Sequence, residues 1–251
     1  MTFLEGIRSE VYFKFRKAQI EGMNKGGGFR AGKVHVSDVI KPCMRYVWYQ
    51  KTNPRPSMDT ESIRPLFFGQ AVHSMTQLAP DEYHELTLAY DLATDKPVDL
   101  KKINLKPDDP KWYDILIGTI DDLLQVHGEW VITDKKTTGS IDYFSRYNSK
   151  PSDSHVDQIN TYRLLLSKCK GIDAGMGAVI YISSSINKEK NDKPIVMPFK
   201  LEPITKTLEI VKKNMAVIKD AMLNDNVPER TKNYLCDGMC PHASVCFTDE
   251  R

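Results

Sequence analysis

The chain has 251 residues, enough for one large domain or for one domain with an appended piece. Hydrophobic residues make up 41% and charged residues 27%, a composition unlike that of collagen-like, disordered or membrane-spanning proteins. No apolar run approaches the roughly 18 residues that a membrane-spanning helix needs. The N-terminal residues also lack the apolar core of a secretion signal, so we expect a cytoplasmic protein with no membrane partner.

The charge is nearly balanced in total but not along the chain. Lys and Arg number 35 and Asp and Glu 33, which gives a net charge of +2. Residues 1–50 hold nine basic against four acidic side chains, whereas residues 79–130 hold five against twelve. A basic part followed by an acidic part suits a protein that brings a polyanion to a site that needs cations, although solvated charged surfaces would give the same counts.

The N-terminal third predicts mainly helices. Ser37 and Asp38 are suited to cap a helix that carries Cys43 and several aromatic residues. Residues 79–113 show only weak alternation and a polar loop. The elements predicted before them are a helix at 3–23, a flexible Gly-rich stretch at 25–33, the capped helix, and a helix at 62–78 with Gly69 and His73.

The rest of the chain alternates between strand and helix patterns, which predicts a mixed α/β fold. The predicted elements are strands at 113–126, 129–137, 174–183 and 194–201, and helices at 157–169 and 204–224. We therefore divide the chain into an N-terminal helical segment at 1–60, an α/β core at 61–203, and a C-terminal helix with a cysteine-rich tail at 204–251.

His127-Gly128 predicts a two-residue hairpin loop, which fixes the register of the strands on either side. Val126 then pairs with Glu129, and Asp121 lies opposite Asp134. Because side chains alternate along a strand, these two carboxylates and one lysine share a face, and the next residues share the other. The first face carries Asp121, Asp134 and Lys136, and the second carries Asp122 and Lys135.

The face with Asp121, Asp134 and Lys136 has the chemistry of a phosphodiesterase site. Two opposed carboxylates repel each other unless a cation lies between them, and Mg²⁺ favours oxygen ligands. Lys136 is placed to orient an attacking water or to neutralise charge on a phosphoryl group. A solvated hairpin whose charged side chains face water is the alternative.

Cysteines gather near the C-terminus, where Cys236, Cys240 and Cys246 fall within eleven residues. Without a secretion signal, this spacing favours a metal site over disulfides. Cys43 supplies a fourth thiolate if the two ends of the chain meet. Four thiolates suit an iron–sulfur cluster or zinc, and three with His242 also suit zinc. The fifth cysteine, Cys169, is expected to be a buried thiol without a role.

Four short motifs resemble those of PD-(D/E)xK nucleases, and they occur in the family's order. The core motif is matched by Gly118-Thr-Ile-Asp121 and by Ile132-Thr-Asp134-Lys-Lys136. Gln158-Ile-Asn-Thr-Tyr162 is similar to the QxxxY element of the RecB-like branch, and Gly69-Gln-Ala-Val-His73 resembles its GxxxH element. With one early and three late cysteines, the chain resembles the CRISPR-associated Cas-four nucleases and the AddB-type repair nucleases.

This resemblance implies a restriction-endonuclease-like core, a mixed sheet flanked by helices, joined to an iron–sulfur region. It implies a metal-dependent exonuclease that acts on single-stranded DNA ends in CRISPR adaptation or DNA repair, with CRISPR integration proteins as possible partners. The implied residues are Asp121, Asp134, His73 and the Lys135 carbonyl for Mg²⁺ or Mn²⁺, Lys136, Gln158 and Tyr162 for catalysis, and Cys43, Cys236, Cys240 and Cys246 for a four-iron four-sulfur cluster. The family commonly has two residues between its second and third cysteines and this chain has three, which keeps zinc open.

A single-stranded substrate also fits basic residues interleaved with aromatic ones near the N-terminus. Aromatic packing around Cys43 would explain the same pattern. Two other functions compete with the nuclease: a non-catalytic DNA-binding adaptor, and a zinc-containing binding module in which the acidic hairpin is incidental. The expected strand-binding residues are Arg16, Lys17, Arg30, Lys33, Lys41 and Arg45, with Phe15, Phe29, Tyr46 and Trp48.

Overall fold

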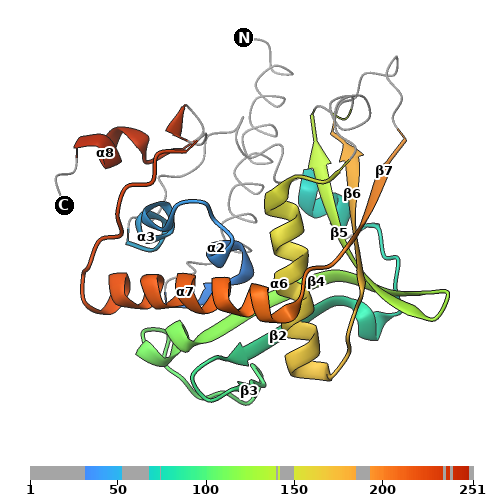
Figure 1. Ribbon diagram of the computed structural model, residues 1–251, viewed down its shortest axis with the longest axis horizontal. Helices are drawn as coiled ribbons and strands as arrows, with labels where there is room; N and C mark the ends of the chain where they lie inside the picture. Colours follow the sequence, from blue (N-terminus) through green and yellow to red (C-terminus); the bar gives the residue numbers. More distant parts are fainter. Residues whose placement is uncertain are drawn as a thin grey trace, which may run out of the picture.

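A seven-stranded mixed sheet forms the centre of the protein (Figure 1). The structure is a computed structural model, and it describes residues 32–52, 68–73, 75–139, 141, 150–184, 193–233, 236–237 and 240–248. The strand order is β3-β2-β4-β5-β6-β7, with β1 paired to β4. The strands are β1 Val34–His35, β2 His84–Asp91, β3 Lys96–Pro97, β4 Ile115–Val126, β5 Glu129–Thr138, β6 Met176–Ser183 and β7 Ile195–Lys200.

Helices cover this sheet, so the predicted mixed α/β architecture is confirmed. Helix α6 connects β5 to the parallel strand β6 and packs against β2, β4, β5 and β6, and α7 packs on α6 and α3 (Figure 1). The helices are α2 Val36–Val39, α3 Met44–Thr52, α6 Asp153–Lys170, α7 Ile204–Leu223 and α8 Ala243–Thr248, and residues 68–73 are also helical. Within the described part of the chain, no helix is both long and apolar enough to cross a membrane.

The hairpin between β4 and β5 has the predicted turn and register. His127 and Gly128 have φ angles of 52° and 86°, as a type I′ turn requires. Pairing runs from Val126 with Glu129 to Asp122 with Thr133. Beyond that point β4 and β5 no longer pair, and β1 pairs with the first half of β4 on the edge that β5 leaves.

Helix α6 lies close to β4 because β4 carries a glycine at the contact. A Cβ at Gly118 would lie 2.7 Å from Leu165 Cδ1, 2.8 Å from Val36 Cγ2 and 3.1 Å from Tyr162 Cε1. The helix ends at Gly171, which has a left-handed φ of 67°. It begins four residues before the predicted start at 157. The glycine therefore lets Tyr162 reach the sheet beside the first strand of the hairpin.

Two predictions about the N-terminal third were wrong. The single helix expected around Cys43 is two helices, α2 and α3, since Pro42 lies between them and proline disfavours a continuous helix. Strand β2, which lies in the region where only weak alternation was expected, was not predicted, although Leu86, Leu88 and Tyr90 share one of its faces. The helix expected at 3–23 and the start of the helix expected at 62–78 lie outside the described residues.

Candidate active site

Asp121 and Asp134 lie where β4 and β5 separate. The ladder between the strands stops at Asp122 and Thr133, one pair short of the predicted pairing of Asp121 with Asp134. On its other edge β5 stays paired with β6 through Asp134 and Val179, and the Lys135 main-chain N–H donates to Asp121 Oδ2 at 2.7 Å. The predicted pairing of Asp121 with Asp134 is thus corrected: β4 and β5 no longer pair at this point, and a hydrogen bond from the Lys135 main chain links Asp121 to β5.

Asp134 is a buried carboxyl group whose ionised form requires positive charge nearby. It is 1% exposed, and its Oδ2 lies 2.6 Å from Lys136 Nζ. Burial raises the pKa of Asp134 to about 6; Lys136 opposes this shift and the negative charge of Asp121 adds to it. Two buried carboxylates with one lysine between strands thus favour a further cation.

His73 completes this group from the helical residues 68–73. Its Nδ1 lies 3.3 Å from Asp121 Oδ2, and its Nε2 lies 3.1 Å from the Lys135 main-chain oxygen. The hydrogen bond to Asp121 raises the pKa of His73, while burial acts in the opposite direction. The structure therefore brings His73, Asp121, Asp134, Lys136 and the carbonyl of Lys135 together in one place.

Glu85 belongs to the same place and was missed in the sequence. Its Oε1 lies 3.8 Å from His73 Nδ1, and within the described residues His73, Glu85 and Asp121 offer ligand atoms that all lie within 4.8 Å of one another. Glu85 has a left-handed φ of 47°, and the β2–β4 pairing is interrupted at this residue. Recognition of β2 would have placed Glu85 across from Asp121 and supplied the missing signal.

Gln158 and Tyr162 face each other along α6, as their spacing of four residues predicts. Gln158 Nε2 donates to Tyr162 Oη at 2.7 Å. Burial and the charge of Asp134 raise the pKa of Tyr162, which keeps the phenol protonated. His155, one turn earlier on α6, was also missed; its Nδ1 lies 2.8 Å from Tyr181 Oη.

The side chains of Asp122 and Lys135 lie on the opposite face of the hairpin, and this part of the prediction is confirmed. They form an ion pair of 2.8 Å. The carbonyl oxygen of Lys135 thus belongs to the site with Asp121 and Asp134, and its side chain does not.

The four cysteines of the predicted cluster line one pocket, in which α3 and α8 also meet. Burial raises the pKa of the Cys240 thiol, and so do the other three thiols. His242 of the same pocket stacks on Tyr49 with ring centroids 5.2 Å apart. Among the described residues, no three thiols come within 4.8 Å of one another. The pocket gathers Cys43, Cys236, Cys240 and Cys246 without bringing them to single-ion spacing.

The strand-binding surface expected near the N-terminus is corrected in part. Arg45 is buried and donates from Nη1 to the Pro228 carbonyl at 3.2 Å, and Trp48 is buried against Tyr49, so neither lies on a binding surface. Lys33 lies over the Trp112 ring. The residues Phe15, Arg16, Lys17, Phe29 and Arg30 lie outside the described residues.

Comparison with known proteins agrees with this geometry. The chain is similar to the crystal structure of SSO0001, with 17% identity, 94% of this chain and 95% of that chain covered, and a TM-score of 0.53, which is a likeness of fold. It also aligns with LHK-Exo, an alkaline exonuclease from Laribacter hongkongensis, at 12% identity, 77% and 91% coverage and a TM-score of 0.40. No curated protein sequence matches. Residues 82–247, which include the hairpin, α6 and three of the clustered cysteines, match the family model of these nucleases, and the chain belongs to the PD-(D/E)XK nuclease superfamily.

Proposed function

We propose that this protein is a divalent-metal-dependent deoxyribonuclease whose active site is centred on Asp121 and Asp134. The observation that carries the proposal is the convergence of these two buried carboxylates with His73 and the Lys135 carbonyl where β4 and β5 separate. Membership of the nuclease superfamily supports the reaction class, and this convergence supports the proposed position of the active site.

The residues of the site fit a hard divalent cation. Carboxylate oxygens, a main-chain carbonyl and one imidazole are donors that suit Mg²⁺ and Mn²⁺. Asp121, Asp134, His73 and the Lys135 oxygen would hold the ion, and Glu85 is close enough to His73 to add a fifth donor. When bound, such an ion supplies an activated water and stabilises negative charge on the phosphate.

The remaining site residues act on the substrate directly. Lys136, held 2.6 Å from Asp134, is placed to orient water and to neutralise charge on the phosphoryl group. Tyr162 and Gln158 are linked by a hydrogen bond and present hydrogen-bonding groups from α6 that position the DNA strand. The raised pKa of Tyr162 keeps its hydroxyl a donor throughout the neutral range.

The substrate we propose is single-stranded DNA, degraded from its ends, in CRISPR adaptation or in DNA repair. This part rests on the likeness of the GxxxH, QxxxY and cysteine motifs to those of the Cas-four and AddB-type nucleases. The same likeness is our reason for proposing DNA and CRISPR integration proteins as partners.

The cysteines are proposed to hold a four-iron four-sulfur cluster with a structural role. Zinc bonds of about 2.3 Å would place tetrahedral thiolates about 3.8 Å apart, whereas no three of the described thiols all lie within 4.8 Å of one another. A cluster of several atoms suits wider spacing, and the gathering of the four cysteines around one pocket supports this proposal. Protein purified without oxygen should be brown, whereas a zinc form would be colourless.

An assay on end-labelled DNA tests the enzymatic proposal. With Mg²⁺ or Mn²⁺, the wild type should degrade single strands, and Asp134→Ala should be slower by at least about a hundredfold. Asp114→Ala is the matched control, because this carboxylate pairs with Lys219 before β4 begins and should retain activity. Equal degradation by the wild type and Asp134→Ala would reject the site, and internal cleavage products would reject exonuclease action.

A further inference from the structure

Asp122 and Lys135 form a buried ion pair that the proposed reaction does not use. Lys135 Nζ lies 2.8 Å from Asp122 Oδ2, and the two side chains are 1% and 0% exposed. Both point away from the face of Asp121 and Asp134. A buried ion pair compensates for its loss of hydration only if further hydrogen bonds satisfy its remaining donors and acceptors. The partners in those bonds therefore show which segments of the chain the pair fixes in place.

The lysine holds the end of the helix that carries His73. Lys135 Nζ donates to the main-chain oxygen of Thr76, three residues after His73. The Thr76 amide and hydroxyl both donate to the Val72 carbonyl, at 3.0 and 2.6 Å, so Thr76 forms the last turn of this helix. A cation at a helix C-terminus satisfies a free carbonyl and interacts favourably with the helix dipole.

The aspartate holds the chain that follows the helix. Asp122 Oδ1 accepts the main-chain N–H groups of Leu78 and Ala79, at 3.0 and 3.1 Å, and lies 2.8 Å from His84 Nδ1. Lys135, His84 and the two amides thus surround the Asp122 carboxylate on the back of the hairpin. Together Asp122 and Lys135 fasten residues 76–79 to the back of the hairpin.

Lys135 therefore contacts the His73 helix through both its side chain and its main chain. Its side chain binds the end of the helix, while its carbonyl lies 3.1 Å from His73 Nε2 and its amide donates to Asp121. We propose that Lys135 is a positioning residue whose side chain, anchored on Asp122, sets the place of His73 at the metal site. This inference rests on the proposed role of His73 as a metal ligand.

Binding of Mn²⁺ to the full-length protein, measured from the electron paramagnetic resonance of the free ion, tests the proposal. Lys135→Met should weaken Mn²⁺ binding by at least about tenfold, the lower end of the effect of residues that orient metal ligands. Lys51→Met is the matched control: Lys51 is 3% exposed, pairs with Asp38 at 3.0 Å and donates to the Lys33 carbonyl. The control should lose stability and keep its Mn²⁺ affinity; an equal loss of affinity in both variants would overturn the proposal.

A double-mutant cycle separates positioning from general damage. In a His73→Ala background, Lys135→Met should change Mn²⁺ affinity by less than about twofold, because its effect passes through the missing imidazole. A full tenfold effect in that background contradicts the proposal. If Lys135→Met does not fold, Asp122→Asn carries the same cycle, since it keeps an acceptor for the two amides and removes the charge that anchors the lysine.

Hydrogen exchange distinguishes failure of this inference from failure of the proposed ligand role. The amides of Leu78 and Ala79 should exchange faster in Lys135→Met than in Lys51→Met, because their acceptor loses its partner. If His73→Ala leaves Mn²⁺ affinity unchanged while these amides exchange faster, the ligand role fails and the fastening of the helix stands. Unchanged exchange rejects the fastening itself.

Discussion

His155 is held neutral inside the protein by the groups that face it. Its Nδ1 lies 2.8 Å from Tyr181 Oη, which also accepts the Ser152 main-chain N–H at 3.2 Å. Because Tyr181 accepts that amide, its own proton is available to the imidazole. Burial, and after it the positive charge of Lys136, lower the pKa of His155 to about 4.

Acid should therefore destabilise the fold through His155. An unfolded histidine titrates near pH 6.5, so between about pH 6.5 and 4 the unfolded chain binds more protons than the native one. The contribution is complete above that window and is lost as the pH falls through it. In urea unfolding at pH 7 and 4.5, His155→Gln should lose about 1–2 kcal/mol less on acidification than the wild type.

His127→Asn is the control for this experiment. His127 lies exposed at the tip of the hairpin with a φ of 52°, a conformation that asparagine tolerates. Its substitution should leave the difference between the two pH values as in the wild type. Parallel curves for His155→Gln and the wild type would contradict the buried, neutral imidazole.

Some residues of the candidate site could be predicted from the sequence and others could not. Asp121, Asp134 and Lys136 were found because a two-residue turn fixes the register, and strand alternation then fixes the faces. Glu85 and His155 carry no such local signal. Glu85 turns toward His73 through a left-handed backbone conformation, and His155 meets Tyr181 only after the chain has crossed to β6.

At the scale of elements, the approach of α6 to β4 decides where the QxxxY residues lie. Gly118 is the point of contact, and the atoms around it belong to Leu165, Val36 and Tyr162. All three side chains are buried in the main core, so they have little room to move.

Gly118→Ala should therefore destabilise the protein and displace Tyr162. Overpacking of this kind costs about 1–3 kcal/mol. Gly175→Ala is the matched control, because no atom lies within 4 Å of a Cβ at that position. Chemical unfolding measures the stability of both variants, and DNA cleavage measures the effect on Tyr162. Equal stability of the two variants would show that the close approach of α6 carries no strain.

Elements were predictable where a turn or a helical period marks them. The His127-Gly128 turn separates the two hairpin strands and α7 has a helical period of apolar residues, and the predicted bounds of all three agree with the structure to within two residues. β2 was missed because its first half is largely exposed and it follows a 3₁₀ helix at Asp81–Tyr83. The start of α6 was placed too late because its first turn is polar and is ordered by contacts with β6.

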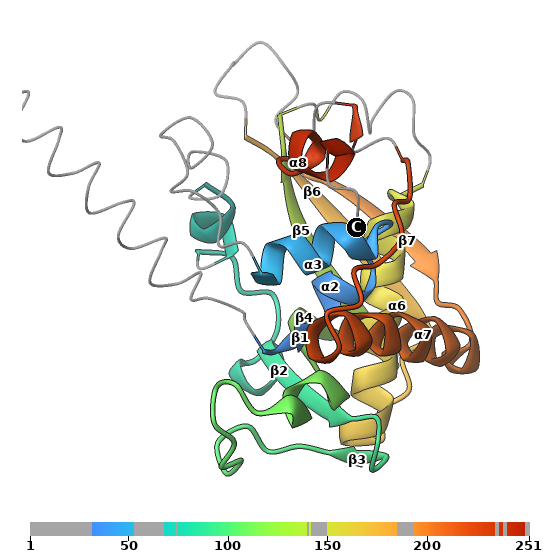
Figure 2. The same ribbon diagram turned by 90° about the vertical axis from the view of Figure 1, so that its left-hand side faces the viewer.

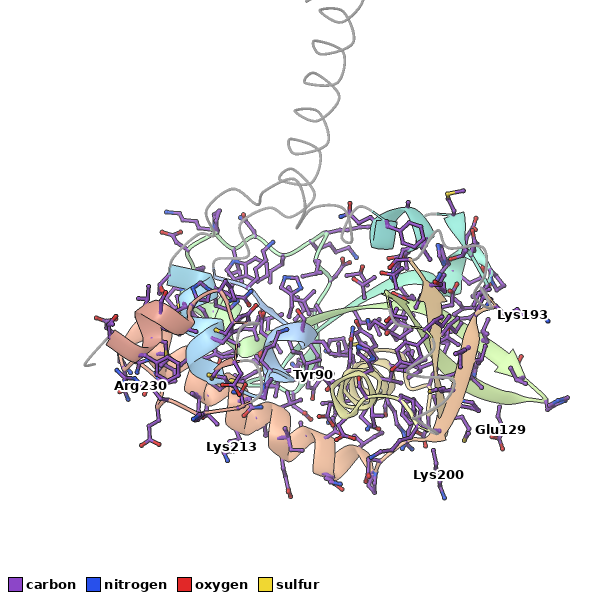
Figure 3. The ribbon with its side chains drawn as sticks, turned by 90° about the horizontal axis from the view of Figure 1, so that it is seen from above. Tyr90, Glu129, Lys193, Lys200, Lys213 and Arg230 are labelled. Carbon is purple, nitrogen blue, oxygen red and sulfur yellow. The ribbon has the colours of Figure 1, made fainter. Side chains whose placement is uncertain are left out.

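At the scale of the whole molecule, segments far apart in sequence meet around the cysteine pocket. Figures 1 and 2 both show α8 beside α3, and Trp48 and Tyr49 of α3 pack with Ala221 at the end of α7. Figure 3 places Arg230, which lines the pocket, at one end of the molecule and Glu129 of the hairpin at the other. The pocket therefore ties the ends of the described chain together away from the hairpin turn.

If the pocket holds the proposed iron–sulfur cluster, its loss should weaken this connection between the two ends of the described chain. Cys43→Ser or Cys246→Ser should remove the visible absorbance of the proposed cluster and destabilise the protein by about 5 kcal/mol, the size expected for opening a loop of this length. The double variant should be no worse than either single one, because the centre is lost in each. Cys169→Ser is the control, since Cys169 donates to the Ala89 carbonyl outside the pocket. Thermal unfolding of the four proteins measures the effect, and additive losses would contradict a shared centre.

The mixed α/β fold of the described residues was predictable from the order of the elements and motifs, and the pairing of β1 with β4 was not. Val34 and His35 pair with Leu116 and Ile117, and a strand of two residues leaves no periodicity to detect. Its place depends on an interaction across 81 intervening residues, which only the assembled sheet provides.

The meeting of early and late segments at the cysteine pocket also determines the order in which this region can fold during translation. Cys43 and the aromatic side of α3 leave the ribosome nearly 200 residues before Cys236 to Cys246 are made, a wait of about 10–40 s at ordinary rates of translation. During that interval Trp48 and Tyr49 cannot pack against Ala221, which has not yet been synthesised. The nascent chain therefore exposes apolar aromatic surface to chaperones until its C-terminal residues have been added.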